Sequence, residues 1–215
     1  MKKILAILGI ACSATLGYSQ GTVIFTANST TYDGFTNTAA FGSGNSGTQG
    51  KTGVSANSYY YALLTQAFTG GTPAANSPNW SFTAYATNST SALFSGGING
   101  GTIAVSGWTP GTTKYVEVVG WSSSLGDTWS AVQAQWASGN WVADGYFGIS
   151  PIGSVASGGV VNNGIASPAS PIFSPTGVSG QTIMYAVTAA PIPEPTTVAL
   201  IGLGGLGLAM IRRRK

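Results

Sequence analysis

The sequence predicts a mainly β protein, in which an antiparallel β-sandwich or jelly-roll-like ectodomain with one short helix lies between an N-terminal signal helix and a C-terminal transmembrane helix. Three observations lead to this prediction. Short segments rich in β-branched and aromatic residues alternate with Gly- and Ser-rich stretches, as in antiparallel sheets with loop connections. One segment has apolar residues at helical spacing. Apolar runs lie beside basic residues at both ends of the chain.

The expected strands are bounded by Gly, Pro or Asn, residues that favour turns. They are residues 22–27, 58–66, 80–87, 101–106, 114–121, 145–150 and 182–188. Three long stretches rich in small polar residues, 42–53, 70–78 and 151–180, are expected to form turns and loops. In the strand at 58–66, side-chain alternation places Tyr60 on the opposite face from Tyr59 and Tyr61.

A single short helix is expected at residues 127–138. Trp129, Val132 and Trp136 recur there at spacings of three and four, which places them on one helical face. Asp127 or Thr128 is positioned to cap the start, and Gly139 to end the helix. We expect the helix to pack on the sheet through its tryptophans.

The first residues have the order of a secretory signal. Lys2 and Lys3 precede the apolar run 4–11, which is too short to span a bilayer stably. Small residues before Gln20 favour cleavage there, so the signal peptide is expected to be residues 1–19. Two alternatives are a buried N-terminal helix and a lipoprotein cleaved before Cys12.

The last residues combine three elements in a fixed order. Pro193, Glu194 and Pro195 precede an apolar run at 196–211, and the chain ends in the basic residues Arg212, Arg213, Arg214 and Lys215. A helix at 196–211 would be roughly 24 Å long, slightly short of the ~30 Å hydrocarbon core, and the arginines can reach the interface. The positive-inside rule predicts that the basic tail stays cytoplasmic and the bulk of the chain lies outside.

This ending resembles the PEP-CTERM sorting signal of Gram-negative bacteria, over residues 191–215. The resemblance implies export, recognition by an exosortase (a membrane transpeptidase that cuts near the Pro-Glu-Pro motif) and association with the cell surface and extracellular polysaccharide. The alternative is a plain membrane anchor with an accidental Pro-Glu-Pro. Residues 20–190 are then the ectodomain, which resembles those of small verrucomicrobial PEP-CTERM proteins in its order of strand, loop, Trp-bearing helix and strand.

Composition excludes several kinds of function. Charged residues make up 6% of the chain, against roughly 25% in an average soluble domain. Outside the two ends, the basic residues are Lys51 and Lys114, which is too few for a phosphate-binding surface, so we expect no nucleic-acid partner. The chain has no histidine, and Cys12 lies in the signal. This excludes Ser-His-Asp and Cys-His catalysis and zinc sites built on His or Cys, and we expect no cofactor and no metal.

The carboxylates leave two further alternatives open. A glycoside hydrolase needs two facing carboxyls about 5–9.5 Å apart, and Asp127 and Asp144 flank the Trp-rich segment. Asp127 also suits a helix cap and Asp144 a turn, so we expect no catalytic residue and no enzyme. Calcium binding by Asp33, Asp127 or Asp144 lacks the spacing of an Asp-rich loop.

Six tryptophans are many for a domain of this size. Most are expected to fill the core, since aromatic residues dominate core burial. Trp121, Trp129, Trp136 and Trp141 are the candidates for stacking on sugars. The sequence therefore predicts a non-enzymatic structural or adhesive protein of the cell surface or extracellular matrix. A lectin-like module for extracellular polysaccharide is the alternative.

Overall fold

A computed structural model describes residues 20–28, 31–43, 47–160 and 164–191. The expected signal peptide at 1–19, the expected transmembrane helix at 196–211 and the basic tail lie outside these residues. Within the described ranges, no helix combines the length and the apolar character needed to cross a membrane. The described fold therefore comprises residues within 20–191.

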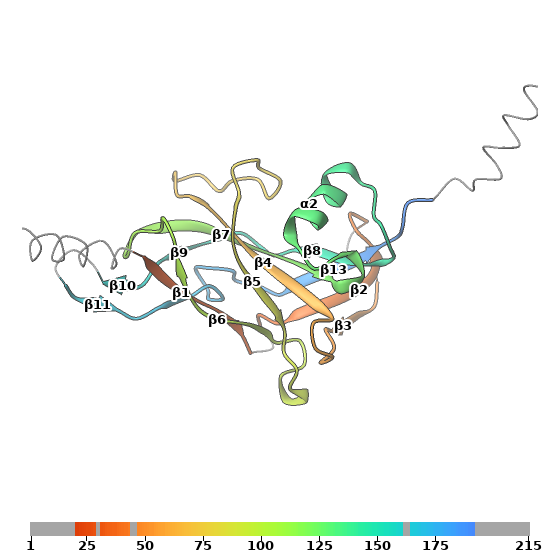
Figure 1. Ribbon diagram of the computed structural model, residues 1–215, viewed down its shortest axis with the longest axis horizontal. Helices are drawn as coiled ribbons and strands as arrows, with labels where there is room; N and C mark the ends of the chain where they lie inside the picture. The colour runs from red at the N-terminus through yellow and green to blue at the C-terminus, as the bar shows by residue number, and fades with distance from the viewer. Residues whose placement is uncertain (1–19, 29–30, 44–46, 161–163, 192–215) are drawn as a thin grey trace, which may run out of the picture.

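The main sheet has eleven strands, in the spatial order β12-β1-β6-β5-β4-β7-β8-β13-β2-β3, with β9 paired to β7 (Figure 1). The strands are β1 (Gly21–Ala27), β2 (Gly34–Ala40), β3 (Gln49–Lys51), β4 (Tyr59–Ala67), β5 (Ser81–Asn88), β6 (Ile98–Val105), β7 (Thr113–Ser122), β8 (Gly145–Ile149), β9 (Gly153–Ala156), β12 (Ser170–Pro171) and β13 (Thr182–Val187). β10 (Gly159–Val160) and β11 (Ala166–Ser167) form a separate two-stranded sheet.

The sheet curls strongly into a half-barrel and is not clearly the sandwich that the sequence predicts. One hydrophobic cluster joins Val23 of β1, Val118 of β7 and Met184 of β13, which are well separated in the strand order. Only a sheet that curls over its own face brings such strands to one core. Continuous backbone pairing from β12 to β3 explains why two facing sheets are not distinguished.

Two strand pairs depart from the expected antiparallel arrangement. β1 pairs with β12 and β13 pairs with β2 in parallel register. Parallel neighbours cannot be joined by a tight turn, and here most of the domain lies between the two members of each pair in the sequence. The sheet is therefore mixed, although most of its pairs are antiparallel.

The central strands β4 and β7 are buried on both faces. In β4, Tyr61 and Leu63 join the cluster inside the curl, while Ala62 and Leu64 join a second cluster on the outer face. Tyr60 lies against this second cluster, opposite Tyr59 and Tyr61, as alternation predicts. The nearly continuous apolar runs of these two strands follow from this double burial.

The second cluster is covered by helix α2 (Trp129–Ser138). Trp129 and Val132 are buried in it and Trp136 packs against its edge, which confirms the predicted helix and its face. Thr128 occupies the N-cap position, and Gly139 ends the helix at φ 69°. Left-handed φ is readily adopted by glycine, because it has no Cβ.

All seven predicted strands are present, shifted at most by a few residues. The expected loop at 42–53 contains β3, and the expected loop at 151–180 contains β9, β10, β11 and β12. These strands are two to four residues long and contain no aromatic residue. β2 was not predicted. Its sequence, GFTNTAA, has few large apolar residues and therefore lacks the alternating pattern that indicates a strand.

Candidate functional site

An aromatic groove lies between helix α2 and the loop at residues 68–80 that joins β4 to β5. Both rise from the same side of the sheet (Figure 1). Its first hollow, of about 340 Å³, is formed by residues 75–78 and Trp80 of the loop, by Trp129, Gln133, Trp136 and Ala137 of α2, and by Leu64 of β4. A second hollow of about 320 Å³ is lined by Trp80, Phe82, Tyr85, Trp129, Ser130 and Gln133. The two hollows share Trp80, Trp129 and Gln133, so they adjoin, and together they are called the groove below.

A β-bulge places two of these rings side by side. β4 and β5 pair regularly up to Leu63 and Ala84, but the next pair is Leu64 with Phe82, so Thr83 is an extra residue in β5. Regular alternation would put Phe82 and Tyr85 on opposite faces, since they are three residues apart. The bulge turns Phe82 onto the face of Tyr85, and their ring centroids lie 4.4 Å apart.

These two rings remain accessible. Phe82 is 43% and Tyr85 is 42% exposed, although both belong to a strand in the middle of the sheet order. Large aromatic side chains at such positions are normally covered. An exposed aromatic pair inside a hollow is a feature of ligand-binding surfaces.

Tyr85 also fixes the position of α2. Its hydroxyl accepts a hydrogen bond from the backbone N–H of Trp129 at 2.8 Å, while the N-cap Thr128 makes no side-chain cap hydrogen bond. At the other end, the buried Gln135 donates to the carbonyl of Leu125 and accepts from the N–H of Val142. These contacts hold one wall of the groove to the sheet and to the flanking loops.

The opposite wall is closed by hydrogen bonds within the loop. The indole N–H of Trp80 donates to the carbonyl of Ala74 at 3.0 Å, and Ser77 donates its N–H to the same carbonyl. The N–H of Asn79 is accepted by the Ser77 hydroxyl. Because the polar atom of Trp80 is already used, its half-buried ring offers apolar surface to the groove.

The four predicted sugar-stacking tryptophans occupy different environments. Trp129 and Trp136 line the groove. Trp121 is fully buried, donates to the carbonyl of Gly126 and has no exposed face for a sugar. Trp141 is half-buried, packs on Phe147 at a centroid distance of 5.1 Å and is not among the groove residues. The structure thus brings two of the four together.

Three groove aromatics were missing from that prediction: Trp80, Phe82 and Tyr85. Trp80 and its neighbours were assigned to a strand that was expected to pack in the core. The clustered aromatic residues at 80–85 were the available signal, but a regular strand would have divided them between two faces. No residue pattern in this segment predicts the β-bulge that brings Phe82 and Tyr85 to one face.

No charged side chain lines either hollow. The polar groups that line the groove are the exposed Gln133 and Ser130 of α2 together with Asn76 and Ser77 of the loop. These groups offer amide and hydroxyl donors and acceptors beside apolar rings. The arrangement suits a neutral ligand that has both hydroxyl groups and apolar faces.

Glu117 is an unexpected buried acid below this region. It lies in β7 directly opposite Leu64, which lines the first hollow, and it is fully buried. Among the described residues, neither of its carboxyl oxygens has a hydrogen-bond partner. Burial raises the pKa of Glu117 to about 8, so the group is mostly protonated at neutral pH. Glu117 is not among the groove-lining residues.

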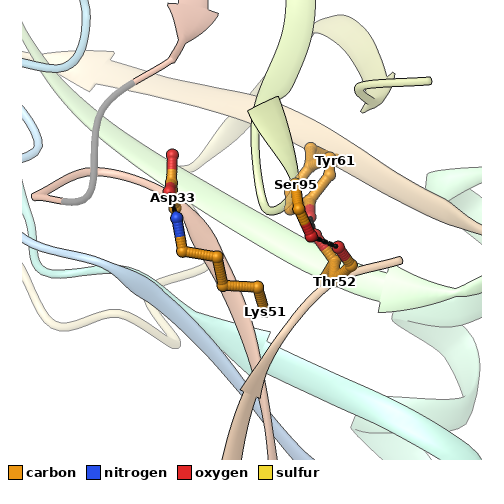
Figure 2. A network of polar contacts seen from close by, with 5 residues as sticks. All are labelled: Asp33, Lys51, Thr52, Tyr61 and Ser95. Atoms are coloured by element: carbon orange, nitrogen blue, oxygen red, sulfur yellow. Dashed lines mark hydrogen bonds and ion pairs between the residues drawn. The ribbon is translucent and has the colours of Figure 1, made fainter. Parts of the chain in front are cut away.

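A second polar cluster, away from the groove, joins Asp33 and Lys51 to Thr52, Tyr61 and Ser95 (Figure 2). Lys51 pairs with the buried Asp33 at 2.7 Å. The Tyr61 hydroxyl contacts that of Thr52 at 3.4 Å, and Ser95 donates to the Thr52 carbonyl at 3.2 Å. Burial raises the pKa of Tyr61. This cluster ties β3 to β4 and to the segment before β6, a structural role.

The remaining candidate acids do not form a site in the described part of the chain. Asp144 accepts a hydrogen bond from the N–H of Ala189 at 2.8 Å, and Asp127 is exposed just before the N-cap of α2. Neither lines the groove. Within the described ranges, no group of three or more acidic, Cys or His residues is arranged to hold a metal ion.

Comparison with known protein families matches residues 191–215 to the PEP-CTERM protein-sorting motif. The chain carries a PEP-CTERM sorting motif. The motif implies that the protein is exported, sorted to the cell surface and processed by an exosortase. No curated protein and no solved structure matches the chain.

The PEP-CTERM motif begins where the described fold ends. The N–H of Ala190 donates to the carbonyl of Trp141 at 2.9 Å, one residue before the matched range. The sorting residues Pro193, Glu194 and Pro195 and the basic residues 212–215 lie outside the described residues. Their assignment rests on the sequence and on the family match.

Proposed function

We propose that this exported, exosortase-sorted protein is a non-catalytic surface or matrix protein whose ectodomain binds extracellular polysaccharide in the aromatic groove. The single observation that carries the proposal is the aromatic, uncharged groove between α2 and the 68–80 loop. It favours the lectin-like alternative and also gives the expected adhesive role a molecular basis. A structural role without ligand binding would not require exposed rings in a hollow.

The chemistry of sugars fits such a groove. One face of a sugar ring carries C–H bonds that pack on an aromatic face, whose quadrupole attracts their slight positive charge. The rim carries hydroxyl groups that exchange hydrogen bonds with amides and hydroxyls. Trp80, Phe82 and Trp136 would supply the faces, and Gln133 and Ser130 the polar contacts.

The lining of the groove supports binding without hydrolysis. Glycoside hydrolysis needs two carboxyl groups flanking the scissile bond. Asp127, Asp144 and Glu117 are all absent from the groove lining. A hydrolase assigned to this groove would therefore lack its acid and its base.

The test is retention of the full chain, purified in detergent, on extracellular polysaccharide extracted from its own host. We expect the wild-type protein to be retained and Trp80→Ala to lose roughly tenfold or more of its affinity, as for a central aromatic contact. Phe94→Ala is the matched control, because Phe94 is a 46% exposed aromatic residue outside the groove. Equal retention of wild type and Trp80→Ala would contradict the proposal, and so would an absence of retention.

A further inference from the structure

We infer that the groove takes a neutral glycan chain, with neighbouring sugar units in its two hollows and Trp80 at their junction. This inference rests on the proposed function and goes further by naming the charge and the length of the ligand. It follows from the shape of the groove and from the positions of every basic side chain in the described domain.

The shape of the groove indicates a chain rather than a single sugar. The hollows measure about 340 and 320 Å³, each near the lower end of the ~300–1,000 Å³ range of small-molecule sites. They adjoin along Trp80, Trp129 and Gln133, so a ligand that continues out of one enters the other. Each hollow has its own aromatic surface, Trp136 in the first and the Phe82–Tyr85 pair in the second.

The distribution of charge indicates a neutral chain. Acidic polysaccharides are held by cationic side chains, and the described domain has only Lys51 and Lys114. Lys51 pairs with Asp33, and Lys114 lies over the ring of Trp108 at 5.5 Å and contacts the carbonyl of Gly107. Both are engaged elsewhere and neither lines the groove.

The N-terminal turn of α2 is the remaining source of positive potential near the second hollow. It reaches the groove through Trp129 and Ser130. However, the N–H of Trp129 is already donated to the Tyr85 hydroxyl. The helix itself contains no charged residue, and Asp127, directly before the N-cap, places a negative charge at this end. This turn therefore gives little preference for an anion.

Two rows of neutral polar groups are placed to orient the chain. Gln133 is exposed at the junction of the hollows, with Ser130 one turn before it on α2. Asn76 and Ser77 face them from the loop. Amides and hydroxyls on both walls suit the hydroxyl rim of a chain that lies along the groove.

The experiment measures binding of the detergent-solubilised full chain to neutral and acidic probes. The neutral probes are soluble β-glucan, galactomannan and chitin oligosaccharides of two to six units; the acidic probes are alginate and polygalacturonate. We expect binding to at least one neutral series, with affinity rising about tenfold or more from two to four units. We also expect little change between low and high salt, because no ion pair is formed.

Phe82→Ala tests the second hollow, since it removes an exposed ring there and leaves the first hollow intact. We expect it to abolish the gain with chain length while preserving binding of the shortest bound oligosaccharide. Gln133→Ala, at an exposed position shared by both hollows, should weaken all lengths. Phe94→Ala should match wild type, and thermal melting of each variant confirms folding.

The outcomes separate the inference from the proposed function. Binding to acidic probes alone, with strong salt dependence, would overturn the inference and leave polysaccharide binding intact. A gain with length that persists in Phe82→Ala would also overturn it. Binding to no probe, together with no retention on host polysaccharide, would overturn the proposed function itself.

Discussion

The buried acid Glu117 gives the domain a pH-dependent stability. The folded protein keeps this proton up to about pH 8, whereas an exposed carboxyl releases it near 4.5. Between these values unfolding releases a proton, so the free energy of unfolding falls as pH rises, by about 1.4 kcal/mol per pH unit. The stabilisation is complete below the unfolded pKa and is lost as pH approaches the folded value.

Glu117→Leu should remove this dependence. The variant also fills the site with an apolar side chain and leaves no unpartnered carboxyl, so it should be more stable than wild type by about 1–3 kcal/mol near neutral pH. Urea unfolding at several pH values between about 4.5 and 8 measures both effects. Asp127→Asn, at an exposed carboxyl, is the control and should follow wild type. If the free energy of unfolding varied with pH equally in wild type and Glu117→Leu, the raised pKa of Glu117 would be contradicted.

Tyr85 contributes a hydroxyl to stability and a ring to the groove. Tyr85→Phe keeps the ring and removes the acceptor for the N–H of Trp129. We expect a loss of about 0.5–1.5 kcal/mol in the free energy of unfolding, the usual range for one hydrogen bond. Polysaccharide binding should change less than in Phe82→Ala. Unchanged stability would show that the start of α2 is held by other contacts.

At the scale of elements, a bulge in β5 accommodates one extra residue and keeps Phe82 on the face of Tyr85. Deleting Thr83 would remove the bulge and leave Phe82 two residues from Tyr85, so regular alternation would still place both rings on one face. We expect the deletion variant to retain its sheet, measured by circular dichroism, and to keep the gain in affinity with oligosaccharide length. Loss of that gain in a folded deletion variant would contradict this account of the bulge.

The elements also show where sequence reasoning succeeds. β4, β7 and α2 were predictable because burial imposes runs of large apolar residues or helical spacing on them. β3, β10, β11 and β12 were not, because strands of two or three residues are too short to show such a pattern. Their pairing is set by neighbouring strands that are distant in the sequence.

The candidate site was half predictable for the same reason. Trp129 and Trp136 follow from the helical face, since spacing along one helix is a local property. Phe82 depends on a bulge and Trp80 on a loop closed by its own indole N–H. The burial of Trp121 depends on its packing under Trp129 of α2 and against Tyr85 of β5. These are tertiary properties, which a local pattern does not contain.

At the scale of the whole molecule, the ectodomain and the sorting motif are expected to act separately. Replacing Glu194 should block processing and leave a membrane-retained species of higher mass, because the exosortase reads the Pro-Glu-Pro motif. Intact-mass spectrometry of protein recovered from the envelope and medium of its host measures this. Asp144→Asn is the control, since Asp144 holds Ala189 but lies outside the motif, and its processing should be normal. Normal processing of the Glu194 variant would show that the motif is not used.

The central claim is that the groove between α2 and the 68–80 loop holds the polysaccharide. Hydrogen–deuterium exchange of the full chain, with and without a bound neutral oligosaccharide, locates the ligand directly. We predict slower exchange at residues 74–85 and 129–137, which form the two walls, and no change at the sheet edges β3 and β12. Protection at those edges, or no protection at either wall while the ligand is bound, would contradict the account.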